Sequence, residues 1–166
     1  IVVEPQVADN LGGGRFALQF EHPSWGSVEL VTYEDSDGTA GFDVTDATGQ
    51  LVFSYVAPMS MFYFEPNGYW EEPGVAIDAA GNIFIQYDAG FMAHFVLRPA
   101  SGGFDYFGTE PDPDNGIGHV EIWEAGDRDG DGVFELMNSV NDCVPDCTMG
   151  TMTYTQYSWT GSDFAP

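Results

Sequence analysis

Hydrophobic and polar residues alternate with a period of two along most of the chain. Eight runs show the pattern, at residues 15–20, 27–33, 50–56, 82–88, 94–98, 119–125, 133–137 and 151–159. They are short, rich in Val, Ile, Phe, Tyr and Thr, and separated by Gly, Pro, Asp and Asn, which is typical of strands and turns. No stretch sustains the 3.6-residue period of an amphipathic helix. The pattern predicts an all-β protein of roughly twelve short antiparallel strands.

Two segments repeat the same local pattern. Residues 46–55 (DATGQLVFSY) and 78–87 (DAAGNIFIQY) each place an Asp, two further residues and a Gly before an alternating strand that ends in Tyr. The Asp side chain is suited to accept hydrogen bonds from the turn backbone, and the Gly to adopt a positive φ, so we expect two hairpin turns. Roughly twelve strands would make about three four-stranded blades, whereas closed propellers use about 4–8 blades. The repeat is therefore compatible with a two-sheet sandwich or with a few propeller-like blades that do not close.

The length of 166 residues suits one compact domain. The Gly-rich start predicts a flexible lead-in over residues 1–14, followed by a single β domain over 15–166.

The charge is strongly one-sided. The chain has 27 Asp and Glu against 3 Arg and no Lys, a formal net charge of −24. This field repels nucleic acid and anionic membrane surfaces, so neither is expected as a partner, and no membrane insertion is expected. The acidity suits a calcium-containing or high-salt exterior.

Two cysteines, Cys143 and Cys147, lie four positions apart. No second Cys or His pair follows at a spacing that suits zinc, so a local disulfide is the favoured interpretation. Closing so short a loop would stabilise the fold by only about 2 kcal/mol and implies an oxidising compartment. With no transmembrane run and a start at Ile1 rather than Met, we expect a processed, exported chain located outside the cell or at its surface.

One acidic segment has the order of a calcium loop. Asp127, Asp129 and Asp131 stand at positions 1, 3 and 5, Gly132 at position 6 permits a sharp turn, and Glu135 stands at position 9. Calcium takes six to eight oxygen ligands in loose geometry, so these four carboxylates, with the main-chain carbonyl of Val133, predict one Ca²⁺ site. An EF-hand is excluded because position 12 is Asn138 and the flanks are strand-like.

The loop resembles the strand-loop-strand calcium loops of integrin-like FG-GAP repeats, with Glu135 in place of the final Asp. The longer stretch 127–164 resembles exported, mostly uncharacterised β-domains of high-GC Gram-positive bacteria. Residues 73–108 are similar to one blade of an NHL-type propeller. These resemblances imply a bacterial cell-surface or extracellular location and no particular catalytic activity.

Two other segments offer weaker sites. Asp35 and Asp37 precede Gly38 as in a second, incomplete calcium loop at 33–38, but position 1 is Tyr33 and a plain turn is the favoured interpretation. The aromatic residues of 60–74 include Tyr63, Tyr69 and Trp70, which could form a platform for sugar rings or could belong to the core.

The sequence therefore favours an exported binding or structural module stabilised by one Ca²⁺ in the 127–135 loop. No catalytic residue is assigned, because no nucleophile stands in an activating motif. Two alternatives remain: a carbohydrate-binding module or secreted glycan-active enzyme that uses the 60–74 aromatics, and a self-assembling subunit of an extracellular filament or surface layer.

Overall fold

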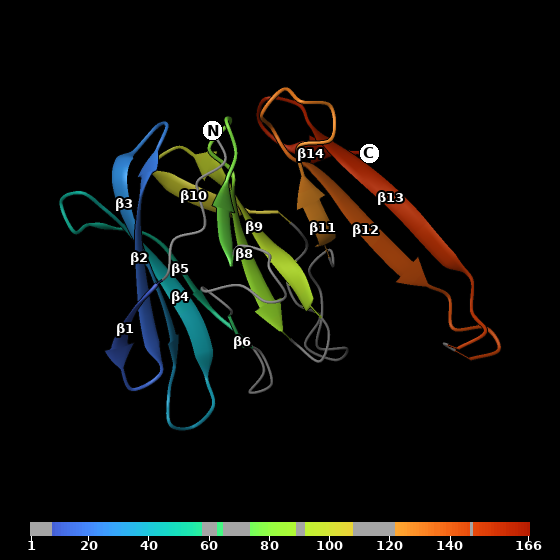
Figure 1. Cartoon of the computed structure of the whole chain (residues 1–166), viewed down its shortest axis with the longest axis horizontal. Coiled ribbons are helices and arrows are strands. Elements are labelled where there is room, and N and C mark those ends of the chain that lie inside the picture. The colour runs from blue at the N-terminus through green and yellow to red at the C-terminus, as the bar shows by residue number, and fades with distance from the viewer. Residues whose placement is uncertain (1–7, 58–62, 65–73, 89–91, 108–121, 147) are drawn as a thin grey trace.

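The computed structural model describes residues 8–57, 63–64, 74–88, 92–107, 122–146 and 148–166 (Figure 1). Fourteen strands, all in antiparallel pairs, account for the regular structure of this part, which confirms the all-β prediction. No helix in the described ranges is long and apolar enough to cross a membrane.

The first sheet is a meander of five consecutive strands in the order β1-β2-β3-β4-β5. The strands are β1 (Asp9–Gly12), β2 (Arg15–His22), β3 (Gly26–Glu34), β4 (Ala40–Asp46) and β5 (Leu51–Val56). The alternation of apolar and polar residues along each strand determines which face of the sheet is buried. In β3, Val28, Leu30 and Thr32 are at most 3% exposed, whereas their neighbours point outward.

The second sheet has nine strands in the order β14-β13-β12-β11-β9-β8-β6, with β10 paired to β9 and β7 paired to β8. They are β6 (Tyr63–Phe64), β7 (Val75–Ile77), β8 (Ile83–Asp88), β9 (Met92–Ala100), β10 (Gly103–Tyr106), β11 (Ile122–Gly126), β12 (Glu135–Asn141), β13 (Met152–Trp159) and β14 (Phe164–Ala165). Within the described residues, which begin again at Ile122, one residue pair, Ile122 with His94, joins β11 to β9.

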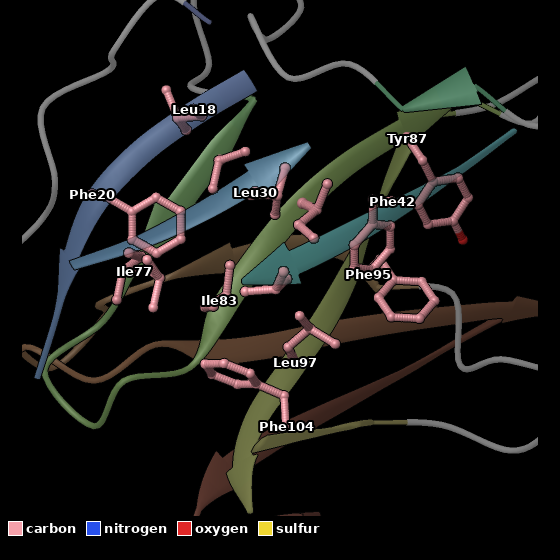
Figure 2. Packing of buried hydrophobic residues seen from close by; sticks show 14 of the residues in the cluster. Leu18, Phe20, Leu30, Phe42, Ile77, Ile83, Tyr87, Phe95, Leu97 and Phe104 are labelled. Atoms are coloured by element: carbon pink, nitrogen blue, oxygen red, sulfur yellow. The ribbon is translucent and has the colours of Figure 1, made fainter. Parts of the chain in front are cut away.

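The first core lies between the two sheets (Figure 2). Its members come from the inner face of β2, β3 and β4 and from one face of β7 to β10. The labelled members are Leu18, Phe20, Leu30, Phe42, Ile77, Ile83, Tyr87, Phe95, Leu97 and Phe104. Phe42 packs edge-on against Phe95 with ring centroids 5.2 Å apart, which joins β4 of one sheet to β9 of the other.

A second core lies on the opposite face of β8 and β9. Phe84 and Val96 point away from the first core and pack with Phe134, Leu136 and residues of β7, β11 and β14. Phe84 and Phe134 stack with centroids 4.9 Å apart. Strand β8 is consequently buried on both faces, which explains why the apolar Phe84 stands between Ile83 and Ile85, where a solvent-exposed face would carry a polar residue.

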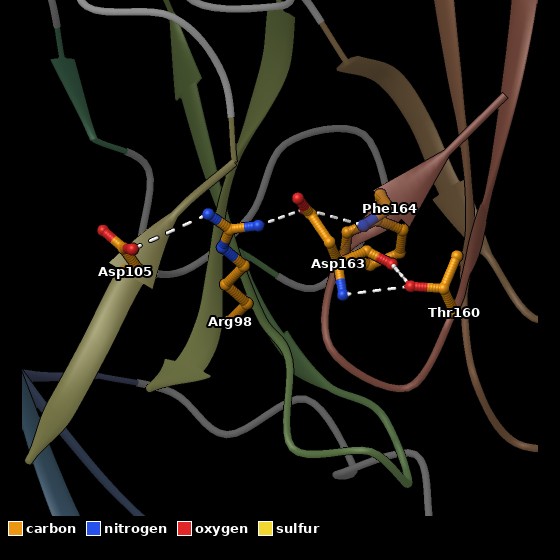
Figure 3. Close-up of polar contacts among 5 residues, drawn as sticks. All are labelled: Arg98, Asp105, Thr160, Asp163 and Phe164. Atoms are coloured by element: carbon orange, nitrogen blue, oxygen red, sulfur yellow. Dashed lines mark hydrogen bonds and ion pairs between the residues drawn. The ribbon is translucent and has the colours of Figure 1, made fainter. Parts of the chain in front are cut away.

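Arg98 ties the C-terminal hairpin to β9. Its guanidinium forms ion pairs with Asp105 of β10, at 3.6 Å, and with Asp163 in the turn before β14 (Figure 3). Asp163 also organises that turn, because its Oδ1 accepts from Phe164 N at 2.8 Å and its carbonyl accepts from Thr160 N at 2.8 Å. One arginine thus joins the β9–β10 hairpin to a turn about sixty residues later in the chain.

The structure differs from the predicted lead-in. Residues 9–12 form β1, which pairs with β2, and Gly12, Gly13 and Gly14 make the connecting turn with φ values of 81°, 61° and 74°. The glycines that suggested flexibility in the sequence here supply a positive φ in a hairpin turn. Residues 1–7 lie outside the described residues.

The two sheets approach each other closely at Gly103. A Cβ atom built there would collide with the backbone oxygen of Val52 in β5. We therefore expect Gly103→Ala to push β10 away from β5 and to lower the free energy of unfolding by about 1–3 kcal/mol in urea denaturation. Gly126→Ala is the matched control, because nothing lies within 4 Å of a Cβ there. Equal losses in both variants would contradict this packing.

Candidate metal centre

The acidic loop connects β11 to β12. Asp127 follows the last residue of β11, and Glu135 is the first residue of β12. Carboxylate oxygens of Asp127, Asp129 and Glu135 lie within 4.8 Å of one another. Asp127 and Asp129 are exposed, and Glu135 is only 8% exposed. The loop therefore brings three carboxylates together between β11 and β12 of the second sheet.

Side-chain-to-backbone hydrogen bonds fold the loop. Asp127 accepts from Gly130 N at 2.7 Å and from Gly132 N at 3.0 Å, one bond on each carboxylate oxygen. Asp129 accepts from Asp131 N at 3.1 Å. Gly130 and Gly132 have φ values of 85° and 88°, which favour glycine. The backbone thus turns around Asp127 and brings the later carboxylates back toward it.

The three carboxylates repel one another. Two unit charges 4.8 Å apart interact by about 1 kcal/mol in water and about 3 kcal/mol at an effective dielectric of 20. The backbone N–H groups offset part of this repulsion, and Glu135 receives one more such bond, from Arg128 N at 2.9 Å. The side chain of Arg128 is directed to Glu124, at 2.9 Å. A cation among the three carboxylates would remove the remaining repulsion.

Two of the predicted ligands are not part of this group. Asp131 lies outside the set of three carboxylates, and its Oδ1 accepts from Val133 N at 2.7 Å. The main-chain carbonyl of Val133 stays a predicted ligand. Of the four predicted carboxylates, the structure brings Asp127, Asp129 and Glu135 together.

The end of the loop docks on the β7–β8 turn. Ala79 N donates to the carbonyl of Gly132 at 2.8 Å, and a Cβ at Gly132 would lie 3.3 Å from the Cβ of Ala79. Phe134 N donates to Asp78 Oδ2 at 3.3 Å, while the Phe134 ring enters the second core. The acidic loop is therefore fixed to the turn that begins strand β8.

Asp78 is the centre of this contact. It is 1% exposed, and its Oδ1 accepts from Ala80 N at 3.0 Å and from Asn82 N at 2.9 Å. Its Oδ2 accepts from Asn82 Nδ2 at 2.8 Å and from Phe134 N. Four donors satisfy a buried carboxylate that would otherwise be costly.

The two predicted hairpin turns are confirmed. Asp46 accepts from Thr48 N at 2.8 Å and from Gln50 N at 3.0 Å in the β4–β5 turn, as Asp78 does in the β7–β8 turn. Gly49 and Gly81 have φ values of 80° and 87°. The turns differ in their surroundings, because only the second is buried against another loop.

His22 continues the buried polar contacts on the other side of this turn. Its Nε2 lies 2.7 Å from the carbonyl of Gly81, and its Nδ1 accepts from Ser24 N at 3.1 Å. The imidazole is therefore neutral with the proton on Nε2. Burial lowers the pKa of His22 below 6.5, although the Gly81 carbonyl and the Asp78 charge act in the opposite direction.

The second acidic segment, 33–38, is the β3–β4 turn. Asp35 N donates to Thr39 O at 2.8 Å, and Asp37 Oδ1 accepts from Thr39 N at 3.0 Å. Hydrogen bonds from the backbone and the side chain of Thr39 lower the pKa of Asp37. In the described part of the chain, neither Asp35 nor Asp37 belongs to a group of three side chains that could hold a metal.

The predicted aromatic platform is mostly outside the described residues, which include neither Tyr69 nor Trp70. The backbone of Tyr63 pairs with Asp88 in the β6–β8 ladder. The adjacent Phe64 packs edge-on against Phe42, with centroids 4.9 Å apart. At least one aromatic of this segment thus belongs to the first core, and the platform itself stays a prediction.

Cys143 has a positive φ of 51°, and its N–H donates to Asn141 Oδ1 at 2.9 Å. It does not carry a free thiol. Cys147 lies outside the described residues, so the bridge between the two stays a prediction.

Comparison with known protein families, curated proteins and solved structures gave no match for this chain. Function must therefore be argued from the geometry of the acidic loop and its surroundings.

The buried turn can be tested against its exposed counterpart. Asp78→Asn replaces one carboxylate oxygen with an NH₂ group. Each of the two oxygens accepts two hydrogen bonds, so the new NH₂ group would face two donors. We expect the free energy of unfolding to fall by about 2–3 kcal/mol in urea denaturation. Asp46→Asn makes the same change in the exposed turn and should cost clearly less. A loss for Asp46→Asn as large as for Asp78→Asn would contradict the role given to Asp78.

The neutral state of His22 makes stability depend on pH. Its pKa is lowered in the folded protein, so between that pKa and about 6.5 the unfolded chain binds more protons. Stability is lost as the pH falls through this window, by at most about 1.4 kcal/mol per pH unit for one proton. Urea denaturation of wild type and His22→Gln from pH 7.5 to 5 should show this extra slope in wild type alone. Parallel curves would refute it.

Proposed function

We propose that this chain is an exported binding or structural module, stabilised by one Ca²⁺ held in the 127–135 loop. The observation that carries the proposal is the convergence of Asp127, Asp129 and Glu135, with oxygens within 4.8 Å, in a loop whose glycines and hydrogen bonds hold it in that shape. Hard oxygen ligands from a turn of this kind suit Ca²⁺.

The ion acts on stability through the contacts of the loop. It removes repulsion between the end of β11 and the start of β12, and it orders the segment whose Gly132 and Phe134 dock on the β7–β8 turn. Together with the second core and the Arg98–Asp163 ion pair, this docked loop attaches strands β11 to β14 to β8 and β9.

The exposure of the site supports an extracellular location. Asp127 and Asp129 are open to solvent. An ion bound here would keep more of its water, and its ligands would be held less rigidly, than in an enclosed cage. We expect a Kd of about 10⁻⁴–10⁻³ M, the range of extracellular modules. The net charge of −24 is also suited to an exterior that contains salt and calcium.

The proposal predicts that calcium raises the melting temperature. At a concentration ten times Kd, one bound ion adds about 1.4 kcal/mol, which corresponds to about 3–6 °C for a domain of this size. Thermal unfolding in 0.15 M NaCl should show this increase on exchanging a chelator for millimolar CaCl₂. Asp127→Asn should lose most of it.

Matched controls separate site binding from general screening of the acidic surface. Asp37→Asn removes the same charge from the β3–β4 turn and should keep the full increase. MgCl₂ at equal concentration should produce less, because Mg²⁺ demands a tighter octahedral site. A calcium increase that is absent in wild type, or equal in Asp127→Asn and wild type, would reject the proposed function.

A further inference from the structure

Within the part of the chain that the structure describes, strand β13 has one edge that is unpaired over most of its length. It pairs with β12 along Met152–Tyr157, and on its other side β14 pairs only with Ser158 and Trp159. Among the described strands, none pairs with the second edge of Met152–Tyr157. Along these six residues, every other N–H and C=O pair points outward from the sheet. Figure 1 shows β12 and β13, in orange and red, as a long hairpin at one end of the molecule.

Other sheet edges within the described structure have features that hinder pairing with another chain. Strand β1 has four residues and a register shift, β6 has two residues, and β10 has four. The edge strand β5 is approached by β10, where Gly103 meets the backbone oxygen of Val52. The β12–β13 ladder runs through six consecutive pairs without a register shift. The free part of β13, MTYTQY, contains no Pro, Gly or charged residue, which are the usual devices that block an edge.

The paired region of this hairpin carries no charged side chain, whereas the connecting turn carries Asp142 and Asp146. In a chain of net charge −24, the segments Leu136–Asn141 and Thr148–Ser162 contain no Asp, Glu, Arg or Lys. Tyr154 is 66% exposed and Met152 is 40% exposed, and alternation places both on the same face of the sheet. The hairpin therefore offers a neutral, Thr- and Tyr-rich strand on a highly acidic protein.

We propose that the free edge of β13 binds the β13 strand of a second copy in antiparallel pairing. A basic partner would be attracted to the acidic surface and gain nothing from a neutral strand. The occupant that fits is itself a neutral free strand, and the same strand of a second copy meets that requirement. Antiparallel pairing about a two-fold axis satisfies both edges at once and closes the assembly as a dimer.

The charge of the whole chain gives this dimer a distinctive salt dependence. Two copies of charge −24 repel each other, and this repulsion is screened as the Debye length falls from about 14 Å at 0.05 M to about 3 Å at 1 M salt. The backbone hydrogen bonds and uncharged side chains of the β13 pair are little affected by salt. The dimer should therefore strengthen as salt is added, whereas a complex held by opposite charges would weaken.

Sedimentation velocity of the full chain in chelator tests the proposal without involving calcium, so its failure leaves the proposed function untouched. We expect monomers in 0.05 M NaCl and a concentration-dependent dimer in 1 M NaCl. Tyr154→Lys, which places a charge on the pairing edge while lowering the net negative charge, should weaken the dimer at least tenfold. Leu51→Lys makes the same charge change at a residue that is 54% exposed on β5 and should leave the dimer intact.

Hydrogen exchange identifies the surface directly. The amides of 152–157 that point away from β12 should exchange more slowly in the dimer than in the monomer. The proposal is overturned if the chain stays monomeric at every salt concentration, if Tyr154→Lys dimerises as well as Leu51→Lys, or if protection on dimerisation falls outside β13.

Discussion

The buried carboxylate of Asp78 is the interaction on which the arrangement of the second sheet depends. It is 1% exposed and accepts four hydrogen bonds, three from its own turn and one from Phe134 N, 56 residues away. That turn begins β8, which is buried on both faces and contributes to both cores. A single charged group thus fixes the acidic loop to the most buried strand of the protein. Removing it would leave several buried donors unsatisfied.

The large negative charge limits how the remaining parts are joined. The 3 arginines of the chain all lie at contacts: Arg98 bridges Asp105 and Asp163, Arg128 pairs with Glu124, and Arg15 lies over the Tyr33 ring. With so few cations, the carboxylates of the 127–135 loop have backbone N–H groups as their main partners. A divalent cation from the medium is the natural counter-charge at such a site, which links the charge of the whole chain to the chemistry of one loop.

Most of the strands and turns that the sequence predicts correctly follow from local patterns of residues. Alternation predicts β2, β3, β5, β8 and β13, and the two Asp-Gly turns follow from local hydrogen bonding. Strand β4 was missed although it is central in the first sheet, because its alternating run, Phe42 to Thr45, covers only four residues after Ala40 and Gly41. The order of acids in the loop predicted four converging carboxylates, of which Asp127, Asp129 and Glu135 converge, whereas Asp131 accepts a hydrogen bond from Val133 N. Asp78 appeared only as a turn residue, because its bond to Phe134 depends on how distant segments pack.

The central claim is that the 127–135 loop is a structural calcium site. A crystal structure of the protein grown with CaCl₂ tests it most directly. The account predicts one well-ordered ion with oxygens of Asp127, Asp129 and Glu135 about 2.3–2.6 Å away. An ordered loop without an ion at saturating calcium, or ions bound only by other surface carboxylates, would contradict it.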